Sequence, residues 1–134
     1  MKGTNMIFII GGSYQGKTDF AVRQFGLNID EITEGSASFE ELAKARCIRH
    51  FEDFVSSAAG RNEDPLELTG KLLISNPDVI IIMTEIGCGI IPIEKSERIY
   101  RELVGKTGCM ITGQAEKVIR VTCGIPAVIK DETT

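Results

Sequence analysis

Residues 7–20 read IFIIGGSYQGKTDF and combine three features of a phosphate-binding loop. The apolar run Ile7–Ile10 is typical of a strand that a parallel sheet covers on both faces. A glycine-rich turn follows that fits the pattern GxxxxGK[ST], and a helical stretch begins at about Asp19. Strand, turn and helix in this order are the context that the motif requires, so we predict that residues 11–18 bind phosphate groups.

The residue types in this turn suit a nucleoside triphosphate. Glycines let several backbone N–H groups point at one phosphate, and the following helix N-terminus adds partial positive charge. Lys17 can reach the β- and γ-phosphates, and the Thr18 hydroxyl can bind Mg²⁺. The predicted nucleotide-binding residues are Gly11, Gly12, Ser13, Tyr14, Gln15, Gly16, Lys17 and Thr18. We therefore expect ATP or GTP as the ligand and Mg²⁺ as the cofactor.

The rest of the chain alternates between strand and helix patterns. Apolar runs predict strands at 79–83, 118–123 and 127–130, with a weaker one at 28–33. Apolar residues three and four apart predict helices at 38–58, from Asp64 onward and at about 94–116. This order predicts an α/β fold with a mostly parallel sheet and helices on both faces. Residues 1–134 have the length of one domain.

Composition and charge exclude several classes of protein. A hydrophobic content of 43% excludes overall disorder, and a net charge of −4 disfavours a nucleic-acid partner. The apolar runs are too short to span a membrane. Four cysteines without metal-ligand spacing predict reduced, buried thiols in a cytoplasmic protein. The sequence leaves a homo-oligomer open.

Phosphoryl transfer also needs a carboxylate that holds Mg²⁺ or activates the acceptor hydroxyl. In a parallel sheet, such groups lie at the carboxyl ends of strands beside the phosphate loop. Glu85 lies two residues after the predicted strand 79–83 and is the best-placed candidate for catalysis and metal binding. Asp30, Glu31 and Glu34 flank the weaker strand and come next. For each of them the alternative is a solvated surface acid.

Four segments of the chain resemble one known family. They are residues 9–18, the stretch MTEIGCGIIP at 83–92, YRELVGK at 100–106 and VTCGIPAVIK at 121–130. Together they resemble the bifunctional adenosylcobinamide kinase / adenosylcobinamide-phosphate guanylyltransferase family of cobalamin biosynthesis. The resemblance implies a RecA-like P-loop NTPase sheet with a C-terminal antiparallel addition.

The resemblance also implies two reactions. One is phosphorylation of the aminopropanol hydroxyl of a corrinoid, adenosylcobinamide, by a nucleoside triphosphate. The other is transfer of GMP from GTP to the resulting phosphate through a guanylylated histidine. Lys17 and Glu85 would then serve the kinase reaction, and the guanylyl group would need an imidazole.

His50 is the chain's single histidine and so the one candidate for that imidazole. Residues 46–50, RCIRH, resemble the family's A-R-I-Q-H stretch, which favours a nucleophile. Residues 60–65, GRNEDP, resemble a later family turn, and this second alignment places His50 on a helix away from the nucleotidylation site. A packing residue on an amphipathic helix therefore stays open as the alternative.

The chain also departs from the family pattern. Thr84 stands where the family has Asn, Lys106 where it has Arg, and Gly108-Cys109 where it often has Asn-Gln. The middle of the chain is shorter by about a strand and a helix. Kinase chemistry is thus better supported than guanylyl transfer. Two alternatives are a shortened paralogue that binds nucleotide without one or both activities, and a non-enzymatic, nucleotide-gated interaction module.

Overall fold

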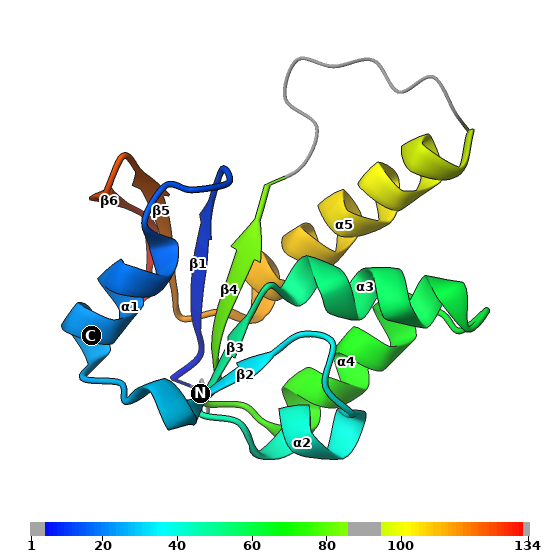
Figure 1. Cartoon of the computed structure of the whole chain (residues 1–134), viewed down its shortest axis with the longest axis horizontal. Helices are drawn as coiled ribbons and strands as arrows, with labels where there is room; N and C mark the ends of the chain where they lie inside the picture. Colours follow the sequence, from blue (N-terminus) through cyan, green and yellow to red (C-terminus); the bar gives the residue numbers. More distant parts are fainter. Residues whose placement is uncertain (1–4, 86–94, 133–134) are drawn as a thin grey trace.

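A six-stranded sheet forms the centre of the protein, as the computed structural model of residues 5–85 and 95–132 shows (Figure 1). The strands are β1 (Ile7–Gly11), β2 (Ile32–Glu34), β3 (Cys47–Arg49), β4 (Ile80–Thr84), β5 (Lys117–Thr122) and β6 (Ile125–Asp131). Their order in the sheet is β2-β3-β4-β1-β5-β6, and β5–β6 is the antiparallel pair. The predicted mostly parallel sheet with a C-terminal antiparallel addition is therefore confirmed.

Helices cover both faces of this sheet, as predicted. They are α1 (Lys17–Phe25), α2 (Phe39–Lys44), α3 (Phe51–Gly60), α4 (Pro65–Ser75) and α5 (Lys95–Gln114), with a short 3-10 helix η1 (Ile29–Glu31) after α1. Helix α1 packs on one face, and the other four lie against the opposite face (Figure 1). In the two described ranges, no helix has the length and apolar character needed to cross a membrane.

The central strands bury both of their faces, which explains their solid apolar runs. Phe8 of β1 and Ile81 of β4 contribute to the core beneath α2–α5. Ile9 and Ile82 point the other way, into the core beneath α1. Because β1 lies between β4 and β5, with Ile9 level with Ile82, the phosphate loop leaves the sheet at its centre.

The single helix predicted for residues 38–58 is wrong. The structure has α2, then β3, then α3 in this region. Cys47 and Ile48 are buried on opposite faces of the sheet, so Ile48 matched a helical spacing while lying in a strand. The predicted capping interaction at the start of α2 is present, since the Glu41 N–H donates to the Ser38 Oγ at 3.2 Å.

The cysteines differ in exposure, which corrects the expectation of buried thiols. Cys47 is buried, and its burial raises the pKa of the thiol to about 12. Cys109 and Cys123 are exposed, and both are free thiols. Cys88 and the family-like residues 86–92 lie outside the described part of the chain.

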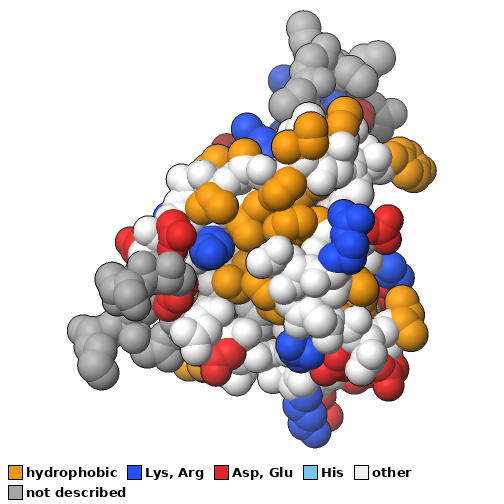
Figure 2. Space-filling model, turned by 90° about the vertical axis from the view of Figure 1, so that its left-hand side faces the viewer, with side chains coloured by type: hydrophobic (Ala, Val, Ile, Leu, Met, Phe, Trp, Pro, Cys, Tyr) orange, Lys and Arg blue, Asp and Glu red, His pale blue; other side chains and the backbone are white. Residues whose placement is uncertain are grey.

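Strand β6 is exposed along most of its length. Figure 2, which looks onto the side that carries α1 and β6, shows hydrophobic side chains gathered in the middle of this face. The exposed large hydrophobic residues of β6 are Ile125, Val128 and Ile129. A strand with one neighbour and an apolar surface leaves an open sheet edge. Self-association remains a prediction.

Candidate functional site

The predicted phosphate loop joins β1 to α1 at the carboxyl edge of the sheet. Gly16 caps α1 in the left-handed region, with φ 86° and ψ 23°, a conformation that glycine adopts without strain. Gly11 has no room for a side chain, because a Cβ there would lie 2.4 Å from the carbonyl oxygen of Val121. The Lys17 Nζ donates a hydrogen bond to the Gly12 carbonyl oxygen at 2.6 Å, so its charge lies inside the curve of the loop.

The β5–β6 turn supports the loop from the side. The Cys123 N–H donates to the Gln15 Oε1 at 2.6 Å, and the Gly124 N–H donates to the Gln15 carbonyl oxygen at 2.8 Å. A Cβ on Gly16 would contact the Gly124 Cα at 3.4 Å, so loop and turn pack closely. The loop conformation therefore depends on a hairpin more than 100 residues later in the chain.

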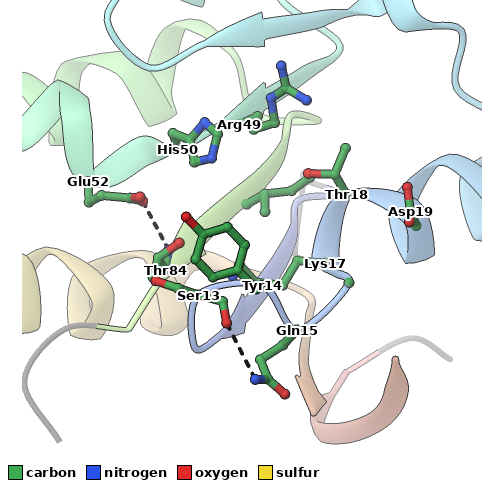
Figure 3. A pocket seen from close by; sticks show the side chains of 12 residues that line it. Ser13, Tyr14, Gln15, Lys17, Thr18, Asp19, Arg49, His50, Glu52 and Thr84 are labelled. Carbon is green, nitrogen blue, oxygen red and sulfur yellow. Dashed lines mark hydrogen bonds between the residues drawn. The ribbon is translucent and has the colours of Figure 1, made fainter. Parts of the chain in front are cut away.

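A pocket of about 380 Å³ opens beside the phosphate loop (Figure 3). Side chains from the loop and the start of α1 lie on one side, and residues of β3, β4 and the start of α3 lie on the other (Figure 3). The lining residues are Ser13, Tyr14, Gln15, Gly16, Lys17, Thr18, Asp19, Arg49, His50, Glu52, Ile82 and Thr84. The pocket thus combines the phosphate loop with three titratable residues of β3 and the start of α3, which are Arg49, His50 and Glu52.

The charges of the pocket act on Lys17. Lys17 is 7% exposed as a whole residue, and desolvation by burial lowers the pKa of its ammonium group. The carboxylates of Glu52 and, to a smaller extent, Glu85 act in the opposite direction and favour the charged form. A largely buried cation beside a glycine-rich loop is suited to a phosphate anion.

His50 is one of the predicted site residues that the fold brings to this pocket. It follows β3, has a left-handed backbone with φ 57°, and is the N-cap residue of α3. Its Nδ1 lies 2.9 Å from the Glu34 Oε1, and its ring lines the pocket opposite the phosphate loop (Figure 3). His50 therefore lies at the start of α3 with a half-exposed side chain. Its role as a nucleophile, and the packing role that is the alternative, both stay predictions.

Glu85 lies close to the phosphate loop, but its carboxylate does not line this pocket. Its backbone N–H donates to the Gly11 carbonyl oxygen at 2.8 Å, while its carboxylate pairs with Arg120 of β5. Glu85 lines a different cavity, of about 410 Å³, on the α5 side of the sheet. Its predicted role in catalysis and metal binding stays a prediction.

The three second-choice acids, Asp30, Glu31 and Glu34, lie in different places relative to the pocket. Asp30 and Glu31 belong to η1, and Glu31 pairs with Arg46 at 3.0 Å, away from the pocket lining. Glu34 ends β2 and contacts both His50 and Arg49. One of the three acids thus reaches the edge of the site.

Sequence reasoning missed Glu52, one of two acids that line the pocket; the other is Asp19 of α1. Glu52 lies in the first turn of α3, and its Oε1 accepts a hydrogen bond from the Thr84 N–H at 3.0 Å. The wrongly predicted long helix concealed it, because Glu52 then had no relation to a strand end. Had β3 been recognised, an acid just after its carboxyl end would have been a natural candidate.

The residues of the pocket fit a magnesium–nucleotide complex better than a free metal ion. Within residues 5–85 and 95–132, no group of three or more His, Cys, Asp or Glu side chains could hold a metal ion. Mg²⁺ often needs only one or two protein ligands when substrate phosphates and water complete its shell. Thr18 and Glu52 both line the pocket, and hydroxyl and carboxylate oxygens are donors of this kind.

The loop and the sheet define the class of the protein. A glycine-rich loop with GxxxxGK[ST] connects the central strand of a mostly parallel sheet to a helix. This is the architecture of a P-loop NTPase-like α/β protein.

The comparison with protein families adds the particular family. The family model described as cobinamide kinase / cobinamide phosphate guanyltransferase matches residues 50–129, more than half of the chain, and the chain belongs to this family. The matched segment begins at His50 and lies after the phosphate loop in the sequence. No curated protein matches the chain.

Proposed function

We propose that this chain is a nucleotide-dependent transferase of cobalamin biosynthesis and forms one nucleotide-binding domain across residues 1–134. It binds ATP or GTP with Mg²⁺ and acts as a cobinamide kinase and guanylyltransferase. Family membership supports the class of activity. The observation that carries the proposal is that the phosphate loop and His50, which come from separate strands, line one pocket.

In this proposal the loop holds the phosphates of the nucleotide. Lys17 exchanges its bond to the Gly12 carbonyl for phosphate oxygens, which are stronger, charged acceptors. Arg49, on the opposite wall, supplies a second cation. Thr18 would hold Mg²⁺, which neutralises charge on the phosphates when it is bound.

The kinase reaction transfers the γ-phosphoryl group to a corrinoid hydroxyl. The hydroxyl oxygen forms a bond to the γ-phosphorus, the bond to the β–γ bridging oxygen breaks, and the nucleoside diphosphate leaves. The hydroxyl proton passes to a carboxylate, and Glu52, on the pocket wall opposite the loop, suits this role. Glu85, which the sequence favours, is the competing candidate.

The guanylyl transfer uses His50 as the nucleophile. Its Nε2 forms a bond to the α-phosphorus of GTP, the bond to the α–β bridging oxygen breaks, and pyrophosphate leaves. An oxygen of the corrinoid phosphate then bonds to the same phosphorus and the N–P bond breaks. The product carries GMP on its phosphate, and the imidazole is regenerated.

Nucleotide binding is tested by calorimetry with ATP and GTP in the presence of Mg²⁺. Lys17→Ala removes a charge-assisted contact and should weaken affinity by about 1.5–3 kcal/mol, or roughly 10- to 150-fold. Lys71→Ala is the matched control, because this exposed lysine of α4 pairs with Glu67 and does not line the pocket. Equal affinity in the wild type and Lys17→Ala would contradict nucleotide binding at the loop.

Turnover distinguishes the enzyme from its two alternatives. The enzyme should release ADP or GDP only when cobinamide is present, and GTP should leave an acid-labile GMP adduct that His50→Ala lacks. Nucleotide binding without any product would favour the shortened paralogue, to which Thr84 and the short middle point. A partner retained only in the nucleotide-bound state, again without product, would favour the interaction module.

A further inference from the structure

Glu34 and His50 form a hydrogen-bonded pair at the rim of the phosphate-loop pocket. Glu34 ends β2, His50 follows β3, and the parallel register sets Glu34 level with Arg49. We propose that Glu34 is a positioning residue that holds His50 as the tautomer with hydrogen on Nδ1, so that the Nε2 lone pair faces the pocket. The consequence for catalysis rests on the proposed guanylyl transfer, whereas the tautomer itself does not.

The hydrogen bond fixes the tautomer because an ionised carboxylate can only accept. With Nδ1 at 2.9 Å from the Glu34 Oε1, the proton of this bond must belong to the imidazole. The other oxygen, Oε2, accepts from the Arg49 Nε at 2.7 Å, so both carboxylate oxygens are engaged. Burial alone would raise the pKa of Glu34, but the hydrogen bonds from His50 and Arg49 outweigh it and hold that pKa below its ordinary range.

The backbone restricts the position of the ring as well. The Gly35 N–H donates to the Arg49 carbonyl oxygen at 2.7 Å, and the Asp53 N–H donates to the His50 carbonyl oxygen at 2.9 Å. His50 itself is confined to the left-handed region between β3 and α3. One edge of the imidazole is therefore bound to Glu34, and Figure 3 shows the ring above Tyr14 and the loop.

This arrangement prepares the Nε2 atom for bond formation. The opposite tautomer would carry hydrogen on Nε2 and have no lone pair for phosphorus. When Nε2 bonds to phosphorus, the ring becomes positively charged while the proton stays on Nδ1. The Glu34 carboxylate then lies against that charge and stabilises it, which is the role that carboxylates have beside histidine in other enzymes.

The tautomer can be read directly, because His50 is the only imidazole in the chain. Tag-free protein labelled with ¹⁵N-histidine gives one imidazole spin system in a long-range ¹H–¹⁵N spectrum. At alkaline pH, where imidazole groups are neutral, we expect the Nδ1–H form to dominate in the wild type. This measurement needs no variant, so it stands even where a variant folds poorly.

Two variants then test the role of Glu34. Glu34→Gln should produce a mixture of tautomers, because an amide can donate as well as accept. Glu31→Gln is the matched control, since it also removes an acid that pairs with an arginine, Arg46, but does not touch His50. It should leave the wild-type tautomer in place.

The outcomes separate this proposal from the proposed function. A wild-type spectrum dominated by Nε2–H, or no change in Glu34→Gln, would overturn the positioning role. If the wild type shows the Nδ1–H form but never a GMP adduct, guanylyl transfer fails and the tautomer assignment stands. Where the adduct forms, Glu34→Gln should slow its formation about 10- to 100-fold when GTP is saturating.

Discussion

Gly35 passes so close to His50 that a Cβ on Gly35 would lie 2.2 Å from the His50 carbonyl oxygen. The contact is between backbones, since the neighbouring Gly35 N–H is bound to the Arg49 carbonyl oxygen. No side-chain movement can relieve such an overlap. The end of β2 and the start of α3 are therefore fitted to each other at the rim of the site.

We expect Gly35→Ala to reduce the free energy of unfolding by about 1–3 kcal/mol, because overpacking forces the backbone to shift. Gly113→Ala in α5 is the control, since its Cβ would meet nothing within 4 Å. It should stabilise the protein by about 0.5–1 kcal/mol through helix propensity. Urea unfolding measures both variants, and a Gly35→Ala protein as stable as the wild type would contradict the close approach.

Glu52→Gln and Glu85→Gln decide which carboxylate serves the kinase reaction. Glu52→Gln keeps an oxygen that can accept from the Thr84 N–H but removes the base, so turnover should fall about 10²–10⁴-fold with little change in melting temperature. Glu85→Gln loses its partly exposed pair with Arg120, and we expect a smaller loss of activity. ADP release in the presence of cobinamide measures both, and the reverse ranking would return the role to Glu85.

Gln15→Ala tests the connection between the phosphate loop and the β5–β6 turn. The variant removes the acceptor of the Cys123 N–H, and one such hydrogen bond contributes about 1 kcal/mol. Because the loop would lose its lateral support, nucleotide affinity should fall by roughly fivefold. Gln24→Ala, at an exposed position of α1, is the control in the same calorimetric titration. Equal affinity in Gln15→Ala would mean that the turn does not shape the loop.

Glu34 should also make stability depend on pH in the acid range. Burial opposes its ionisation, but hydrogen bonds from His50 and Arg49 lower its pKa below the ordinary value of 4.5. The folded state then binds this proton less readily than the unfolded state, so the stabilisation is present above that value and is lost as the pH falls through the lowered pKa. The difference in unfolding free energy between the wild type and Glu34→Gln should therefore shrink from about pH 6 to about pH 3. A constant difference would contradict the lowered pKa.

The sequence predicts the first strand, the loop and α1 because motif and periodicity agree there. It fails in the middle because β3 is only three residues long and flanked by charged residues. Cys47 and Ile48 are both buried, so β3 shows no alternation, and the neighbouring helices impose their own spacing. Tertiary packing, rather than local pattern, makes this segment a strand.

The site residues also differ in how far the sequence predicts them. A motif predicts the phosphate loop, since backbone geometry there demands particular residue types. His50 could be named because it is the only imidazole, but its place beside the loop depends on β3. The contacts of Glu52 with Thr84 and of Glu34 with His50 join separate elements, so no sequence spacing predicts them.

The hydrogen bonds between Gln15 and the β5–β6 turn have a consequence for synthesis of the chain. The loop is translated early, but its partners at residues 123 and 124 emerge from the ribosome more than 100 residues later. Strand β1 likewise pairs with β4 and β5, which are both translated later than β1. Contacts of such long sequence separation form late in folding. A nascent chain should therefore acquire a fully shaped phosphate loop only after the hairpin has been released, which ties any nucleotide binding to completion of the sheet.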